Sequence, residues 1–215
     1  MPESPTEADL PLKQRALIVA SRLLRSNGYE ATRLEDIAAE LGVTAPALYW
    51  HFASKSDLFY ALLKQIIEEF NAAIDSAFAD GPSDPESTLR RVAAAHTRIQ
   101  LAGLDDAQSY TAMSFSHSQL TSWMTDEQAL ALRNSSRIYF ERVRDVVRRG
   151  MSEGVFAEGD AAVATFAIIN ICEYSHLWYQ NDRDRSIEQV ALMHAEFAAS
   201  IAIGAVRDRT PGNVR

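Results

Sequence analysis

The chain has 215 residues, 47% of them hydrophobic, which is enough to bury a core in one or two domains. Its formal net charge of −8 excludes a surface that attracts polyanions everywhere, so any contact with nucleic acid must be local. The single cysteine, Cys172, excludes an internal disulfide, and the acidic, proline-rich start is unlike a secretion leader. We therefore expect a folded protein of the reducing cytoplasm.

The longest apolar run covers residues 161–172, about half the length that spans a bilayer. It contains Asn170 and is followed by Glu173. This pattern predicts a buried helix and no membrane partner.

Residues 1–11 carry three prolines among acidic residues, which predicts a flexible N-terminal arm. Helical periodicity begins at residue 12. The apolar positions that carry it are Ala16, Leu17, Ala20, Leu23 and Leu24. Gly28 is expected to end this first helix.

Two short helices follow. Thr32 and Glu35 have the T-x-x-E spacing of a capping box, which predicts a helix start. Gly42 suits the left-handed residue that ends this helix, and Pro46 suits the first turn of the next one. Two short helices joined by a glycine-containing turn predict a helix-turn-helix.

The rest of the chain also has helical patterns. Ser54 and Asp57 predict the cap of a long helix over residues 55–80, and the stretch from Gly81 to Pro85 interrupts it. Further helices are predicted at 86–102, 106–120, 126–150, 161–180 and 187–206. The spacings T-x-x-Q at Thr125 and Gln128 and S-x-x-Q at Ser186 and Gln189 mark the starts of two of them. No strand alternation of useful length appears, so the fold class is all-α with about nine helices.

The N-terminal motif resembles the DNA-binding domain of the tetracycline-repressor (TetR) family of bacterial transcription regulators. The resemblance is carried by Thr32-x4-Ile37-Ala38-x3-Gly42-Val43 and by Leu48-Tyr49-x-His51-Phe52-x-Ser54-Lys55-x2-Leu58. It implies a helix-turn-helix DNA-binding domain over 12–60 and a helical domain for ligand binding and dimerisation over 61–208. It also implies a homodimer that binds double-stranded operator DNA.

The resemblance further implies that the helix starting at Thr44 to Pro46 enters the major groove. Base edges would face Thr44, Ala45 and Ala47, and phosphates would be bound by Tyr49, His51 and Lys55. The remaining predicted DNA-binding residues are Thr32 and Arg33 on the flanking backbone, with Pro46 and Trp50 in the same segment. Hydroxyls, helix N-termini and lysine are common phosphate donors.

This segment departs from a typical base reader because it has no Arg, Asn or Gln between Thr44 and Phe52. Direct readout would rest on Thr44, on alanine methyls against thymine, and on DNA shape. Leu48 and Phe52 lie at i, i+4 spacing and are expected to face inward.

The middle and C-terminal segments combine aromatic residues with a few polar groups, which is typical of a small-molecule pocket but also of a core with a wet edge. The predicted ligand-binding residues are Met113, Phe115, His117, Trp123, Tyr139, Phe140, Tyr174, His176 and Trp178. The sequence Leu177-Trp178-Tyr179 resembles family members that sense acyl-CoA or sterol-derived thioesters, although the basic residue of those members is missing here. A hydrophobic or aromatic effector and an acyl thioester both stay open.

The last two long helices carry apolar stripes with many small residues, which favours a dimer interface over the alternative of monomer core helices. The predicted interface residues are Phe166, Asn170, Val190, His194, Phe197, Ile201 and Ala205.

Glu173 and His176 have the E-x-x-H spacing of carboxylate-bridged metal sites, but the sequence lacks the second such motif that these sites need. No catalytic or nucleotide-binding motif appears, and neither a metal, a cofactor nor enzyme activity is predicted. Two alternatives stay open: a helical-bundle metal protein or enzyme with an incidental helix-turn-helix, and a ligand-independent architectural DNA binder.

Overall fold

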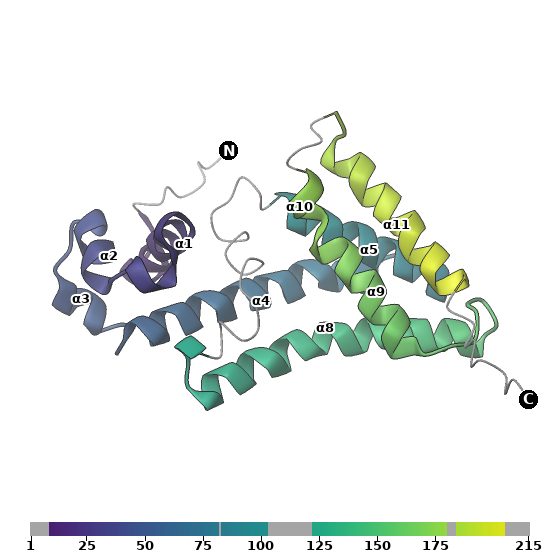
Figure 1. The fold of residues 1–215 in the computed structure, drawn as a ribbon, viewed down its shortest axis with the longest axis horizontal. Coiled ribbons are helices and arrows are strands. Elements are labelled where there is room, and N and C mark those ends of the chain that lie inside the picture. Colours follow the sequence, from purple (N-terminus) through teal and green to yellow (C-terminus); the bar gives the residue numbers. More distant parts are fainter. Residues whose placement is uncertain (1–8, 82, 103–121, 180–183, 205–215) are drawn as a thin grey trace, which may run out of the picture. The chain divides into compact units, whose positions relative to one another are not determined.

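The computed structural model describes residues 9–81, 83–102, 122–179 and 184–204 (Figure 1). Within these ranges all the regular elements are helices, which confirms the all-α class. They are α1 (Leu12–Ala31), α2 (Leu34–Leu41), α3 (Ala45–Tyr49), α4 (Lys55–Ala79), α5 (Pro85–Ala102), α8 (Asp126–Ser152), α9 (Ala161–Glu173), α10 (Ser175–Tyr179) and α11 (Ile187–Ile203). The helix predicted at 106–120 lies outside the described residues, as does most of the predicted N-terminal arm.

The chain divides into two compact units. Among the described residues, the first unit holds 9–68 and 122–133, and the second holds the remainder. The helices α4 and α8 each contribute residues to both units. The predicted domain boundary after residue 60 falls inside α4, shortly before the end of the first unit's N-terminal segment.

The first unit is built on one apolar core shared by α1 to α4. Its buried members are Ala16, Leu17, Val19, Ala20, Leu24, Leu34, Ile37, Ala38, Leu48, Phe52, Leu58, Phe59 and Leu62. The chain leaves helical geometry at Gly28 (φ 78°, ψ 170°), where the first helix was predicted to end, and α1 continues beyond it to Ala31. Positive φ is readily adopted by glycine.

The core of the second unit lies among α4, α5, α8, α9 and α11, and α5 contacts both α9 and α11. Alanines allow the close approach of α5 and α11, where Ala94 meets Ala191 and Ala195. Gly150 of α8 is equally constrained, because a Cβ added there would collide with the Phe156 ring. Small residues thus set how closely this unit packs.

The predicted helix caps downstream of α3 are confirmed. The Asp57 amide donates to Ser54 Oγ at 3.1 Å at the start of α4. Thr125 and Gln128 form reciprocal backbone-to-side-chain bonds of 3.2 Å before α8. Ser186 and Gln189 form the capping box of α11.

The single helix predicted over 161–180 is wrong, because the chain leaves helical geometry at Tyr174 (φ −88°, ψ 10°) between α9 and α10. Two side chains bond to carbonyl groups freed at this break. Ser175 Oγ donates to the Cys172 carbonyl oxygen at 2.7 Å, and His176 Nδ1 lies 2.9 Å from that of Glu173. The break is therefore stabilised by its own sequence.

No helix in the described ranges is both long enough and apolar enough to cross a membrane.

Candidate nucleic-acid interface and sensor core

The turn between α2 and α3 positions the predicted recognition helix. Gly42 takes the left-handed conformation (φ 68°, ψ 30°), and the Val43 amide donates to the Ala38 carbonyl at 2.9 Å. Thr44 then adopts extended geometry at the N-cap of α3, without a side-chain bond to the helix. The Thr44 side chain is exposed and its hydroxyl is not used for capping.

The two faces of the segment after α2 differ as predicted. Leu48 is fully buried and Phe52 is nearly so, and both belong to the first unit's core. Trp50, by contrast, is 89% exposed, and Tyr49 and His51 are exposed beside it. The inward apolar pair thus holds an outward face of aromatic and polar side chains.

The exposed face includes most of the predicted DNA-binding residues. Thr44, Pro46, Tyr49, Trp50 and His51 are exposed, and Ala45 and Ala47 are partly so. The Tyr49 hydroxyl donates to Glu35 Oε1 at 3.2 Å, and this hydrogen bond raises the pKa of the phenol. Tyr49 therefore stays a protonated donor at neutral pH.

Lys55 has partners within the first unit. Its Nζ donates to the Tyr29 carbonyl at 2.7 Å and to the Glu30 carbonyl at 3.3 Å. The same ammonium group lies 4.1 Å from the centre of the Tyr29 ring. Lys55 therefore ties the start of α4 to the end of α1 in addition to its predicted role toward phosphate.

The structure corrects the capping box predicted at Thr32. The Thr32 side chain is buried, and its hydroxyl donates to the Gly28 carbonyl at 2.8 Å. The N-cap of α2 is instead Arg33, which makes no side-chain capping bond. Arg33 is exposed, whereas burial leaves the Thr32 hydroxyl no open side toward DNA.

Trp123, predicted as a ligand-binding residue, lies in the first unit. Its ring stacks on Tyr29 with centroids 4.2 Å apart and an interplanar angle of 10°. Its carbonyl oxygen accepts a 2.7 Å bond from Ser56 Oγ. Trp123 thus packs the segment before α8 against the end of α1 and the start of α4.

The second unit contains a polar cluster that includes Tyr139, one of the predicted ligand-binding residues. The hydroxyl of Tyr139, on α8, lies 3.0 Å from His96 Nδ1 on α5. His96 Nε2 lies 3.1 Å from Glu173 Oε2, and Gln100 Nε2 donates to the same oxygen at 2.7 Å. Burial, more than the nearby Cys172 and Glu173, raises the pKa of Tyr139 well above its usual range. Glu173 was considered only as part of the E-x-x-H motif, and His96 and Gln100 were not predicted as site residues.

The other predicted ligand-binding residues of this unit differ in how far they are exposed. His176 is buried and turns to the Glu173 backbone, and Phe140 is partly buried. Tyr174 and Trp178 are exposed, although the Trp178 ring lies 5.9 Å from that of His194. The predicted Met113, Phe115 and His117 lie outside the described residues.

The predicted dimer stripe is corrected at two positions. Val190 and His194 are buried inside the second unit, because α11 turns that side toward α5. Thr97 Oγ1 of α5 lies 3.0 Å from His194 Nδ1. Phe166 and Phe197 are exposed, whereas Asn170 and Ile201 are partly so, and Ala205 lies outside the described residues.

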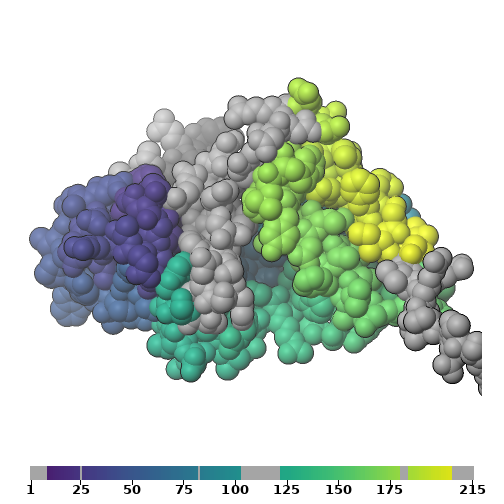
Figure 2. All heavy atoms as spheres, in the orientation of Figure 1, coloured from purple at the N-terminus to yellow at the C-terminus, as the bar shows by residue number. Residues whose placement is uncertain are grey.

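Figure 2 shows α9 (green) and α11 (yellow) on one surface of the second unit. The large apolar side chains exposed on α9, α10 and α11 are Val163, Phe166, Leu177, Trp178, Leu192, Phe197 and Ile203, with Tyr174 at the break. So many exposed apolar groups on neighbouring helices are typical of a protein interface.

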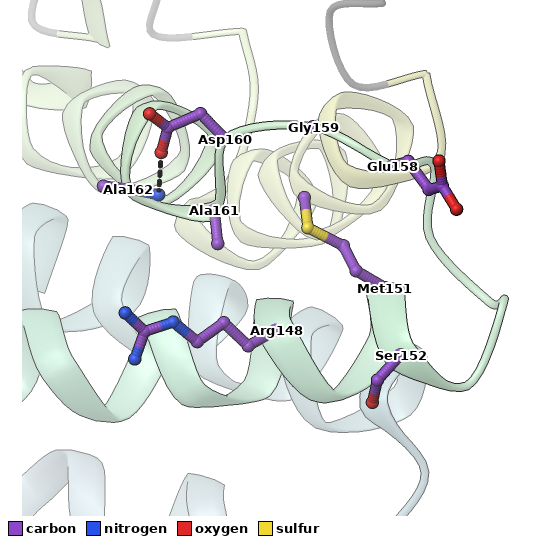
Figure 3. Close-up of a pocket in the computed structure, with 8 residues that line it drawn as sticks. All are labelled: Arg148, Met151, Ser152, Glu158, Gly159, Asp160, Ala161 and Ala162. Carbon is purple, nitrogen blue, oxygen red and sulfur yellow. Dashed lines mark hydrogen bonds between the residues drawn. The ribbon is translucent and has the colours of Figure 1, made fainter.

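A shallow hollow of about 540 Å³ lies where α8 ends and α9 begins (Figure 3). Asp160 stands at its α9 side and accepts bonds from the Ala162 and Val163 amides at 2.7 and 3.3 Å. The helix N-terminus is therefore already occupied by a carboxylate, which disfavours an anion there.

Within the described residues, no three His, Cys, Asp or Glu side chains gather in a way that could hold a metal ion. The Glu173 carboxylate turns to His96 and Gln100, while the His176 ring bonds the backbone. The side chains of Glu173 and His176 thus do not point to a common metal position.

Two family models match the chain. Residues 17–62 match the model for bacterial regulatory proteins of the tetR family, and residues 82–202 match the C-terminal domain of tetracyclin repressor-like proteins. The second match alone covers more than half of the chain.

Individual relatives agree with these models. The transcriptional regulator AcrR of Shigella flexneri is 41% identical over 83 residues, which are 37% of each protein, so the chain aligns with well under half of that relative. The solved structure of PfmR from Thermus thermophilus is 30% identical with a TM-score of 0.71, over 90% of this chain and all of that one. The structure of AibR with isovaleryl coenzyme A and operator DNA has a TM-score of 0.74 at 19% identity, over 89% of this chain and 97% of that one. At this identity the likeness to AibR shows the fold alone.

Proposed function

The chain belongs to the tetR family of bacterial transcription regulators, which bind DNA through a helix-turn-helix, and from this membership we propose that it is a repressor. It binds a palindromic operator as a homodimer in the cytoplasm, and a hydrophobic small molecule releases it. It has no catalytic role in this scheme.

The observation that carries the proposal is the exposed face of α3. Leu48 and Phe52 anchor the helix in the core, and Thr44, Tyr49 and His51 are left outside with hydroxyl and imidazole groups that suit base edges and phosphates. Arg33 precedes α2 and Lys55 begins α4, so a cationic residue stands on either side of this segment in the chain. A small helix anchored from below and polar outside fits a major groove.

Dimerisation is supported by the exposed apolar side chains of α9 to α11. Phe166 and Phe197 are both more than half exposed, although large aromatic rings usually lie buried. A two-fold axis through this surface would give two recognition helices, which read half-sites about 34 Å apart or a multiple of that spacing. The operator should then be a palindrome.

Release by an effector requires that the effector bind the DNA-incompetent state more tightly than the competent one. The helix α4 supports such coupling, since it begins next to the helix-turn-helix and ends in the second unit.

Selection of bound fragments from the source genome tests the proposal. We expect recovery of one or a few palindromes, and indifferent recovery of all sequences would favour an architectural DNA binder instead.

Sedimentation of the wild type and of the double variant Phe166→Ser with Phe197→Ser tests the proposed dimer interface. We expect the wild type to be a dimer and the double variant to be a folded monomer that has lost operator affinity. A double variant that is still a dimer would place the interface elsewhere.

Metal analysis of the purified protein tests the remaining alternative. A stoichiometric iron or zinc content would contradict the repressor proposal in favour of a metal protein.

A further inference from the structure

The carboxylate of Glu35 lies beside the exposed side chains of α3. Glu35 is an exposed residue in the first turn of α2, and its Oε1 accepts a hydrogen bond from the Tyr49 hydroxyl of α3 at 3.2 Å. The helices α2 and α3 pack against each other on the two sides of the turn at Gly42 (Figure 1). An acidic side chain therefore stands on the surface that is proposed to meet DNA.

The position of the Glu35 side chain follows from the missing capping box. In such a box the carboxylate would turn back to the backbone amide of the N-cap residue. The Thr32 hydroxyl instead donates to the Gly28 carbonyl, and Arg33 is the N-cap of α2. The Glu35 carboxylate reaches across to α3, where it meets Tyr49.

The charge of Glu35 disfavours contact with the DNA backbone. Phosphates are anionic and bind cations and hydrogen-bond donors. Among the described residues no ion pair neutralises Glu35, whereas Glu40 on the same helix pairs with Arg22. An acid at this place lowers DNA affinity unless it meets a hydrogen-bond donor of a base.

Few base groups in the major groove can donate to a carboxylate. Guanine presents only the acceptors N7 and O6, and thymine presents the acceptor O4 beside its methyl group. Adenine has a donor at N6, but its acceptor N7 lies next to it and repels a carboxylate. Cytosine presents the N4 amino group without such an acceptor on the same base. Glu35 therefore favours cytosine over the other three bases.

Tyr49 orients the carboxylate before DNA is bound. An ionised carboxylate accepts hydrogen bonds at both oxygens. Since the Tyr49 hydroxyl occupies Oε1, the oxygen Oε2 is left to accept from a base. A long side chain that is already held in place loses less conformational freedom on binding, and this favours a selective contact.

We propose that Glu35 determines operator specificity by accepting a hydrogen bond from the N4 amino group of one cytosine in each half-site. This rests on the proposed function, since it names a base that the proposed operator contact reads. Tyr49 is a positioning residue in this scheme, because it acts through Glu35. The segment from Thr44 to Phe52 has no arginine, asparagine or glutamine that could supply the same selectivity.

Selection from a pool of randomised DNA duplexes tests the proposal with the full-length protein. We expect the wild type to enrich a palindrome with a cytosine at one fixed position of each half-site, and Glu35→Ala to enrich the same palindrome without that preference. Thymine has an acceptor where cytosine has its amino group. Replacing both C·G pairs by T·A should therefore weaken wild-type binding by about tenfold to a hundredfold in an anisotropy titration, and should change Glu35→Ala little.

Asp36→Ala is the matched control, because Asp36 is also exposed in the first turn of α2 and carries the same charge. Both variants should bind all DNA somewhat more tightly at low salt, but Asp36→Ala should keep the cytosine preference. A preference retained in Glu35→Ala, or lost equally in Asp36→Ala, would overturn the proposal. A uniform gain of affinity as the only effect of Glu35→Ala would overturn it too, since Glu35 would then merely repel the backbone.

Two further variants make the test sharper. A glutamine can pair with adenine N6 and N7, so Glu35→Gln should shift the preferred base from cytosine to adenine, and an unchanged cytosine preference would contradict the proposal. Tyr49→Phe should keep the cytosine with a smaller preference than the wild type. Thermal unfolding checks that each variant is folded.

The selection also separates this inference from the proposed function. A palindrome enriched by the wild type without a cytosine that depends on Glu35 would defeat this inference alone. No enriched sequence at all would defeat the proposed repressor and this inference together.

Discussion

The ammonium group of Lys55 lies 4.1 Å from the centre of the Tyr29 ring and donates to the Tyr29 carbonyl oxygen at 2.7 Å. The first residue of α4 thereby holds the last turn of α1, beside the segment expected to meet DNA. A residue predicted only as a phosphate ligand thus also has a structural role.

Lys55→Ala should lower both stability and DNA affinity. Loss of the carbonyl bonds and the cation–π contact should cost about 1–2 kcal/mol of the free energy of unfolding, measured with urea. The salt dependence of operator binding should lose about one unit of slope per contact removed. Lys64→Ala is the control on the same helix, because Lys64 forms an ion pair with the exposed Glu68. If Lys55→Ala matched Lys64→Ala in both measurements, neither role would stand.

Tyr49→Phe should weaken operator binding by about fivefold, the effect of one neutral hydrogen bond, without changing the melting temperature. The hydroxyl is exposed and bonds only Glu35 in the described structure, so its loss should cost little stability. Tyr60→Phe on α4 serves as the matched control. Unchanged operator affinity in Tyr49→Phe would remove this hydroxyl from the proposed DNA contacts.

Cys172 should be inert toward thiol reagents in the native protein. It is buried, its thiol lies 3.6 Å from the Ala93 carbonyl, and burial raises its pKa to about 12. Since the thiolate is the reactive form, Ellman's reagent at pH 8 should react only after denaturant is added. Fast stoichiometric reaction of the folded protein would contradict this burial.

Stability should fall on the acid side because of His194. Burial, with a smaller effect of His96, lowers the pKa of His194 below its usual 6.5. The unfolded state then takes up a proton that the folded state resists, so this contribution is complete above about pH 6.5 and is lost as the pH falls through the folded pKa.

Thermal unfolding between pH 8 and pH 5 measures the effect. His194→Gln should flatten the acid side of the curve, whereas His51→Gln, at an exposed position, should leave the wild-type slope. Equal acid slopes in wild type and His194→Gln would show that His194 does not contribute.

Local chemistry explains which features could be predicted from sequence. Gly42 and the caps at Ser54, Thr125 and Ser186 depend on residues within one helical turn, and the structure confirms them. The Thr32 hydroxyl could either accept from the amide at the start of α2 or donate to the Gly28 carbonyl. It is buried and donates to Gly28, so the predicted capping box does not form.

Features that depend on tertiary packing were harder to predict from the sequence. The helix α11 is apolar on more than one side, and only its packing on α5 shows that Val190 and His194 face inward. The cluster of Tyr139, His96 and Glu173 joins residues from three helices far apart in the chain. The predicted DNA-binding residues came from the resemblance to the TetR family, and helical spacing predicted only that Leu48 and Phe52 face inward, which the structure confirms.

The three tryptophans lie in three different environments: Trp50 is almost fully exposed beside α3, Trp123 is stacked on Tyr29, and Trp178 lies against His194. The chain therefore carries its own spectroscopic reporters. With two of the three replaced by phenylalanine, the emission of the remaining indole would separately follow the proposed DNA face, the contact of the segment before α8 with α1, or the exposed surface at α10 and α11, without an added label.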